Sequence, residues 1–173
     1  MVDPFKASSV IYDFKQYIRD VPDFPIPGVT FKDIQLLLSD PKAFRQAIFE
    51  MFCKFETAVD YWVGIDSRGF IFATGLSQYS NKGLKLIRKK DKLPPPKESK
   101  TYDLEYGTDT IEIQPGKGRV IIVDDVYATG GTMDAAEQLC KQAGYDVIGK
   151  VVLIDLAFLH KPTNVESVIK YEA

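Results

Sequence analysis

The chain has 173 residues, of which 45% are hydrophobic and 27% are charged, and its formal net charge is −2. This length and composition suit one globular domain with a sizeable core, and the slightly acidic balance argues against a broad nucleic-acid surface. No segment approaches the roughly 18 apolar residues of a membrane span, and the first residues lack the basic start and apolar core of a secretory signal. The sequence therefore predicts a single domain over 1–173 that is cytoplasmic and binds neither nucleic acid nor membrane.

The first predicted element is an amphipathic helix over 8–19, in which apolar residues recur at steps of three and four. Three prolines, Pro22, Pro25 and Pro27, then forbid a helix and favour an extended path over 22–34. A stiff segment of this kind either straps the first helix to the core or holds backbone groups at fixed positions against a flat ligand.

The middle of the chain alternates between helix and strand patterns. The pair Asp40-Pro41 predicts a capped helix start. Residues 61–65 predict a short strand, and the polar turn 66–69 leads into a helix over 70–80. Such turns gather at the carboxyl ends of the strands in an open α/β sheet. Arg68 is therefore a candidate for binding an anion beside 124–132, although a surface arginine is the simpler alternative.

A predicted strand over 84–88 leads into a segment with the composition of a mobile loop. Residues 93–100 are too polar and too rich in proline to form core. Residues 101–114 then alternate like the two strands of a hairpin that turns at 107–109. A long loop on a hairpin beside a binding site has the anatomy of a lid, which we place at about 93–110.

The strongest pattern in the chain lies in 119–143. Residues Val120 to Val123 are consecutive β-branched apolar residues, typical of a strand in a buried parallel sheet, and they precede the acids Asp124 and Asp125. The loop A-T-G-G-T at 128–132 supplies glycines and hydroxyls, and the apolar residues after it recur at helical spacing. A glycine-rich loop at a helix N-terminus is a seat for an anion.

Two common phosphate-binding motifs do not fit this loop. A Walker loop needs a lysine after its last glycine, and none follows Gly130 or Gly131; the G-x-G-x-x-G spacing of dinucleotide-binding proteins is also missing. Two carboxylates so close to a phosphate would repel it, so they must face another group. A ribose monophosphate suits both the loop and the acids, because its phosphate can bind in the loop while its ring hydroxyls donate to the carboxylates. The alternative is an ordinary strand-to-helix turn that ends in solvated acids.

Two more strands complete the predicted sheet, a buried one over 146–156 and an edge strand over 165–171. The alternation of strands and helices predicts one α/β domain with a parallel core and an antiparallel flap.

The whole pattern resembles the adenine phosphoribosyltransferase family, a branch of the type I phosphoribosyltransferases. The resemblance rests on motifs that stand in the family's order: P-D-F-P-x-P-G-V-x-F-K-D-I at 22–34, G-I-D-S-R-G-F-I-F at 64–72, L-I-R-K-K-D-K-L-P at 86–94, Y-D-L-E-Y-G at 102–107 and the stretch ending in A-T-G-G-T. It implies the type I phosphoribosyltransferase fold, in which helices flank a central, mainly parallel sheet. It also implies an N-terminal hood over about 1–35.

The resemblance implies a purine-salvage reaction in which adenine and 5-phosphoribosyl 1-diphosphate give AMP and diphosphate. It also implies Mg²⁺ held mainly through the sugar diphosphate, with no direct protein ligand, and a homodimer. Two alternatives remain. One is an enzyme for 6-oxopurines such as xanthine or hypoxanthine with the same sugar site, and the other is a non-catalytic relative that senses the sugar diphosphate and regulates a partner.

The resemblance and the charges together assign roles to individual residues. Glu105 and Arg68 are the expected catalytic residues, with Glu105 hydrogen-bonded to N7 of the base. The expected ribose and 5-phosphate ligands are Asp124, Asp125, Ala128, Thr129, Gly130, Gly131 and Thr132. The expected diphosphate ligands are Arg68, Lys89 and Lys92, the expected base contacts are Thr30, Lys32, Val126 and Glu105, and Tyr106 belongs to the lid. Pro95 stands where the family usually has glycine, and because proline fixes φ it should restrict the hinge of the lid.

Overall fold

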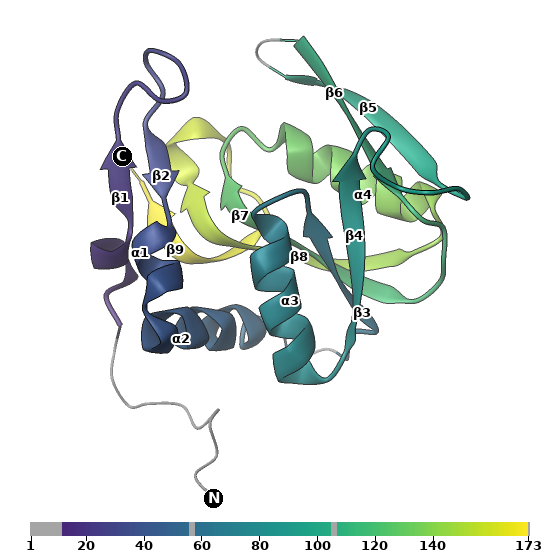
Figure 1. Ribbon diagram of the computed structural model, residues 1–173, viewed down its shortest axis with the longest axis horizontal. Coiled ribbons are helices and arrows are strands. Elements are labelled where there is room, and N and C mark those ends of the chain that lie inside the picture. The colour runs from purple at the N-terminus through teal and green to yellow at the C-terminus, as the bar shows by residue number, and fades with distance from the viewer. Residues whose placement is uncertain (1–11, 56–57, 105–106, 173) are drawn as a thin grey trace, which may run out of the picture.

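One sheet of seven strands forms the centre of the structure, a computed structural model that describes residues 12–55, 58–104 and 107–172 (Figure 1). The parallel strands are β3 (Tyr61–Ile65), β4 (Gly83–Lys89), β7 (Arg119–Tyr127), β8 (Asp146–Leu156) and β9 (Glu166–Tyr171). The antiparallel strands are β5 (Glu98–Leu104) and β6 (Gly107–Ile113). Because the spatial order is β5-β6-β4-β3-β7-β8-β9, the antiparallel pair forms one edge. The predicted parallel sheet with an antiparallel flap is confirmed.

Helices cover both faces of this sheet. On one face, α2 (Pro41–Phe52) and α3 (Gly69–Ser80) pack with Ile121 and Val123 of β7. On the other face, α4 (Gly131–Gln142) packs with Val120 and Ile122. Successive residues of a strand point to opposite faces, so the β-branched run at the start of β7 is buried on both sides, as its composition predicted. Among the residues described, no helix has the length and hydropathy needed to cross a membrane.

The start of α2 follows its sequence signal. Oδ1 of Asp40 accepts hydrogen bonds from the amides of Lys42 at 2.9 Å and Ala43 at 3.0 Å, and Pro41 occupies the first helical position. The side chain thus satisfies amides that have no partner within the helix.

The hood differs from the prediction. A 3₁₀ helix, η1 (Phe14–Tyr17), is followed by the antiparallel pair β1 (Arg19–Val21) and β2 (Phe31–Asp33), and then by a short helix, α1 (Gln35–Ser39). The helix predicted over 8–19 is therefore wrong within 12–19, the part of it that the structure describes. Apolar spacing suggested the helix, but only the 3₁₀ turn over 14–17 forms; Ile18 is extended, and Arg19 already pairs with Asp33 of β2.

Three strand boundaries also differ from the prediction. The loop expected over 93–100 is shorter, because β5 begins at Glu98 and its first residues pair with β6. The hairpin turn expected at 107–109 is wrong, because these residues belong to β6 and pair with 102–104. The central strand β7 does not end at the acid pair but continues to Tyr127, because Val126 and Tyr127 pair with β8. The acids are consequently held on a strand and not on a loop.

Candidate active site

The acid pair lies near the carboxyl end of β7. Asp125 is only 5% exposed, and its amide donates to Oδ1 of Asp124 at 2.9 Å. Oδ2 of Asp125 lies 2.7 Å from Nε of Arg68. This contact is an ion pair without hydrogen-bond geometry, and Oδ2 accepts no hydrogen bond within the part of the chain that the structure describes. A buried acceptor of this kind is stabilised when a ligand supplies a donor.

The protonation of both acids is shifted by their surroundings. Burial raises the pKa of Asp124 well above its ordinary value, and the neighbouring charge of Asp125 raises it further. Burial also raises the pKa of Asp125, against the lowering effect of the Arg68 guanidinium. Two buried carboxylates side by side disfavour each other's charge, so hydroxyl donors from a ligand would stabilise the ionised pair.

The loop between β7 and α4 shares a cavity with Asp124, one member of the acid pair. Gly130 has a φ of 94°, and a Cβ atom at this position would lie 2.5 Å from Oη of Tyr127, so glycine is needed for both conformation and space. The first amides of α4, which begins at Gly131, have no carbonyl partner within the helix. Asp124 and residues 126–133 line a cavity of about 100 Å³. The structure thus brings Asp124, Val126 and the whole predicted phosphate loop together.

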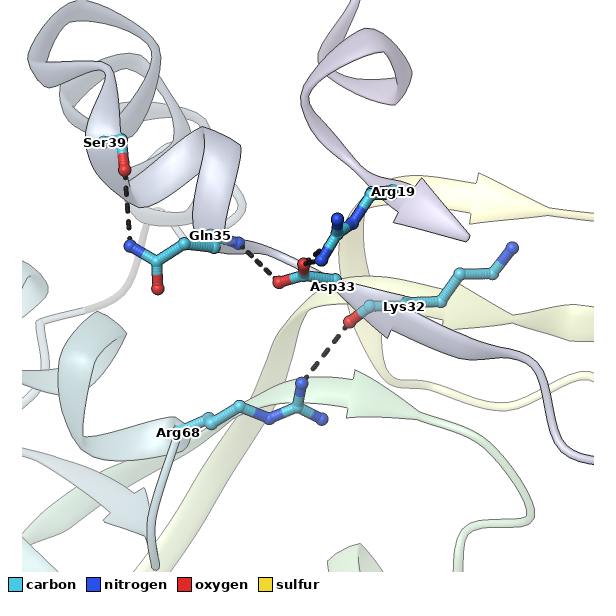
Figure 2. A network of polar contacts seen from close by, with 6 residues as sticks. All are labelled: Arg19, Lys32, Asp33, Gln35, Ser39 and Arg68. Atoms are coloured by element: carbon cyan, nitrogen blue, oxygen red, sulfur yellow. Dashed lines mark hydrogen bonds and ion pairs between the residues drawn. The ribbon is translucent and has the colours of Figure 1, made fainter. Parts of the chain in front are cut away.

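Arg68 connects three segments that are distant in the sequence. It stands in the turn between β3 and α3 and pairs with Asp125 on β7. Its guanidinium lies 4.6 Å from the ring centroid of Phe31, and its Nη1 donates to the carbonyl of Lys32 at 3.4 Å (Figure 2). The predicted proximity of this turn to 124–132 is confirmed, and the hood joins the same cluster.

The predicted base contacts of the hood point in different directions. Nζ of Lys32 binds both carboxylate oxygens of Asp20 at 2.8 Å and lies 4.0 Å from the ring centroid of Tyr171. In Figure 2 the Lys32 side chain extends away from Arg68, while its carbonyl faces Arg68. Thr30 is exposed just before β2. The main chain of Lys32 therefore faces Arg68, whereas its side chain binds Asp20.

Asp33 fixes the end of the hood strand. It pairs with Nη2 of Arg19 at 2.7 Å and accepts a hydrogen bond from the amide of Gln35 at 2.9 Å (Figure 2). The Gln35 amide and then the Arg19 side chain lower the pKa of Asp33, with a smaller contribution from the charge of Arg68. The carboxylate thus links β1, β2 and α1 and holds the backbone of Lys32 in place.

The two lysines predicted to bind the diphosphate, Lys89 and Lys92, lie at and just beyond the carboxyl end of β4. Nζ of Lys89 is 3.3 Å from Oδ2 of Asp109, and Lys92 is exposed just beyond the strand. Asp66, in the turn before Arg68, accepts from the amide of Lys89 at 3.3 Å and pairs with Nε of Arg88 at 3.0 Å. These contacts attach the end of β4 to the turn that carries Arg68.

The flap meets the phosphate loop through a residue that the sequence did not single out. The hydroxyl oxygens of Tyr102, on β5, and Thr132 are 3.3 Å apart. Tyr102 stands in the Y-D-L-E-Y-G motif at 102–107, which was its only signal. The expected catalytic Glu105 and the lid residue Tyr106 lie outside the described residues.

Comparisons with known proteins agree with this geometry. Residues 37–170 match the family model described as "Phosphoribosyl transferase domain". The chain is 48% identical over 164 residues to the adenine phosphoribosyltransferase of Bdellovibrio bacteriovorus, covering 92% of this chain and 99% of the relative.

Two solved structures are similar over nearly their whole length. An adenine phosphoribosyltransferase from Rhodothermus marinus has a TM-score of 0.83 at 43% identity, with 91% of this chain and 96% of that chain covered. One from Giardia lamblia, complexed with 9-deazaadenine, has a TM-score of 0.85 at 33% identity, with 93% and 97% covered.

Proposed function

The chain belongs to the adenine phosphoribosyltransferase family, and from that membership we propose that it transfers the phosphoribosyl group of 5-phosphoribosyl 1-diphosphate to adenine, giving AMP and diphosphate. The observation that carries the proposal is the cavity in which Asp124 faces the loop 128–132 at the start of α4. An acid pair beside an anion seat suits a sugar that carries both hydroxyls and a phosphate.

At the sugar end, the 5-phosphate would bind the amides of Gly131 and Thr132 and the hydroxyls of Thr129 and Thr132. The ribose hydroxyls would donate to Asp124 and Asp125, whose Oδ2 lacks a hydrogen bond in the described part of the chain. Ionisation of both acids then becomes favourable, because each accepts hydrogen bonds that offset the desolvation of its charge.

At the diphosphate end, Arg68, Lys89 and Lys92 would hold the leaving group. Departure of the diphosphate concentrates negative charge on its oxygens while the sugar becomes cationic, so fixed cations lower the barrier. Mg²⁺ would supply further neutralisation of the diphosphate. The ion would be held mainly through the substrate, and the buried Oδ2 of Asp125, which accepts no hydrogen bond in the described part of the chain, is an oxygen of the kind that suits Mg²⁺ beside the sugar seat.

At the base end, Val126 would pack against the flat face of adenine, and main-chain groups of the hood at Thr30 and Lys32 would read its edge. Adenine presents a donor at N6 beside an acceptor at N1, and fixed backbone groups that match this pair mismatch a 6-oxopurine. Glu105 would hydrogen-bond to N7 while N9 forms its bond to C1 of the ribose, the bond from C1 to the diphosphate breaks, and the N9 proton passes to the departing diphosphate or to water.

A base-specificity assay tests the proposal. Purified protein, 5-phosphoribosyl 1-diphosphate and Mg²⁺ are mixed separately with adenine, hypoxanthine, guanine and xanthine, and both diphosphate release and the nucleotide product are measured. We expect AMP from adenine and at most traces of product from the other bases. Turnover of a 6-oxopurine in preference to adenine would favour the oxopurine alternative, and absence of any product with retained binding of the sugar diphosphate would favour the regulator.

We further propose that the protein acts as a homodimer, on the ground of its family membership alone. Sedimentation velocity at micromolar concentration measures this directly, and a single monomeric species in the presence of both substrates would contradict it.

A further inference from the structure

A buried carboxylate fastens the segment that carries Lys92. Glu112, on β6, is only 2% exposed. Its Oε1 lies 2.9 Å from Nζ of Lys97, and its Oε2 accepts a hydrogen bond from the amide of Asp91 at 3.1 Å. One carboxylate therefore holds both ends of the segment 91–97.

The chain turns sharply where this segment begins. The amide of Lys90 donates to the carbonyl of Thr110 at 3.0 Å, and that of Lys92 donates to the carbonyl of Lys89 at 3.2 Å. Between them Asp91 has a φ of 62°, which places it in the left-handed region. Since Lys92 directly follows this residue, the bond from the Asp91 amide to Glu112 sets the direction in which Lys92 leaves β4.

The opposite charges of Glu112 and Lys97 strengthen the attachment of the segment 91–97. The hydrogen bond from Lys97 lowers the pKa of Glu112, and the hydrogen bond to Glu112 raises the pKa of Lys97. Each group thus stabilises the charge of the other. The intervening residues 94–96 are all proline, and their fixed φ angles stiffen the path between the two ends. Release of Lys97 would therefore displace the whole segment and not one side chain.

We propose that Glu112 is a positioning residue for the diphosphate site: through Lys97 and the amide of Asp91 it places Lys92, and through the ladder of β4 and β6 it places Lys89. The proposal rests on the proposed function, in which Lys89 and Lys92 bind the diphosphate. Glu112 acts through these residues and does not touch the substrate itself.

Kinetics of Glu112→Gln and Lys97→Met test the proposal. Each variant removes the charged hydrogen bond between Glu112 and Lys97, and Lys97→Met also removes the 3.6 Å ion pair of Lys97 with Asp91. We therefore expect the KM for 5-phosphoribosyl 1-diphosphate to rise about tenfold, with kcat and the KM for adenine within about twofold. The double variant should be no worse than the more affected single variant, since both changes remove the same contact. Lys97→Arg, which keeps the charge, should recover part of the loss.

Glu137→Gln is the matched control. Glu137 also holds two lysines, Lys141 and Lys150, each at 2.6 Å, but these lysines stand on α4 and β8 and not on β4 or the segment 91–97. This variant should change the melting temperature and leave the KM for the sugar diphosphate unchanged. A merely structural role for Glu112 would give it the same profile.

Calorimetric titration with 5-phosphoribosyl 1-diphosphate and Mg²⁺ gives the same comparison without turnover. Wild-type binding and AMP formation together with unchanged affinity in Glu112→Gln and Lys97→Met would overturn the positioning role and leave the proposed function intact. A wild-type protein that forms no AMP would overturn the proposed function first. If Glu112→Gln does not fold, Lys97→Met decides the question, because the Lys97 side chain is 26% exposed and is easier to replace.

Discussion

The two ends of the proposed site differ in how their charged groups are matched. The sugar-phosphate end comes from one stretch, 124–132, where burial raises the pKa of Asp124 and Oδ2 of Asp125 accepts no hydrogen bond in the described part of the chain. The diphosphate end is assembled from distant segments, and two of its three proposed cations already have anionic partners, since Arg68 pairs with Asp125 and Lys89 with Asp109.

Because of this difference, ligand binding should change the free energy of the two ends in different ways. At the sugar-phosphate end, a ligand supplies hydrogen bonds to buried groups that destabilise the folded protein when they have no partner. The full free energy of these hydrogen bonds therefore contributes to binding. A ligand at the diphosphate end must compete with internal ion pairs, so binding there exchanges one partner for another. Arg68 belongs to both ends, because it is a proposed diphosphate ligand and pairs with Asp125 of the sugar-phosphate end.

The largest effect is expected at the base. Glu105→Gln should lower kcat about 100-fold, with the KM of both substrates within about twofold, because an amide can donate a hydrogen bond to N7 but cannot transfer a proton to it. Steady-state kinetics with each substrate varied in turn measure this. An unchanged kcat would show that Glu105 takes no part in catalysis.

Variants of the acid pair should affect substrate binding and the melting temperature in different ways. Asp124→Asn and Asp125→Asn should each raise the KM for 5-phosphoribosyl 1-diphosphate about tenfold or more, through the loss of a charged acceptor. Without ligand, however, Asp124→Asn should raise the melting temperature by about 3 °C, equivalent to about 1 kcal/mol, because it removes a buried charge. Asp125→Asn should lower it, because Arg68 loses its partner.

The rise in melting temperature expected for Asp124→Asn should depend on pH. Because the pKa of Asp124 in the folded protein is raised above the ordinary 3.8, its protonation stabilises the fold fully below pH 3.8, and this stabilisation is lost as pH rises through the raised value. Melting temperatures from pH 4 to pH 8 should therefore diverge between wild type and Asp124→Asn as pH rises. Parallel curves would show that the carboxylate is not strained by burial.

Gly130→Ala tests whether the phosphate loop is shaped by the residues beneath it. The positive φ and the approach to Tyr127 should together cost about 2 kcal/mol of unfolding free energy. Gly28→Ala is the control, because Gly28 has a φ of 87° with nothing within 4 Å of its Cβ position, so it should cost about half as much. Equal losses in urea unfolding would mean that contact with Tyr127 is unimportant.

The smallest effect concerns the contact between flap and loop. Tyr102→Phe removes the hydroxyl that lies 3.3 Å from Thr132, and we expect kcat/KM for the sugar diphosphate to fall about threefold, as for one neutral hydrogen bond. Thr101→Val, which alters a neighbouring hydroxyl pair between β5 and β6, is the matched control and should leave kcat/KM unchanged. Equal effects of the two variants would assign the loss to flap stability.

Much of the architecture could be predicted because its signals are local. The cap at Asp40, the β-branched run of β7 and the glycine loop before α4 each depend on residues within a few positions of one another. For the same reason the sugar-phosphate end was predictable as a unit: 124–132 carries its acids, glycines and hydroxyls in one stretch.

The sequence by itself therefore determined the fold class and pointed to the proposed sugar-phosphate seat, whereas only the tertiary structure decided how the remaining segments meet. Pairing with β2 turned the end of a predicted helix into β1, and pairing with β8 extended β7 past the acids to Tyr127. The contact of Arg68 with Phe31 and that of Lys97 with Glu112 likewise join residues from separate elements. The physical reason is that strand register and side-chain pairing across the fold depend on partners far along the chain, which local spacing does not encode.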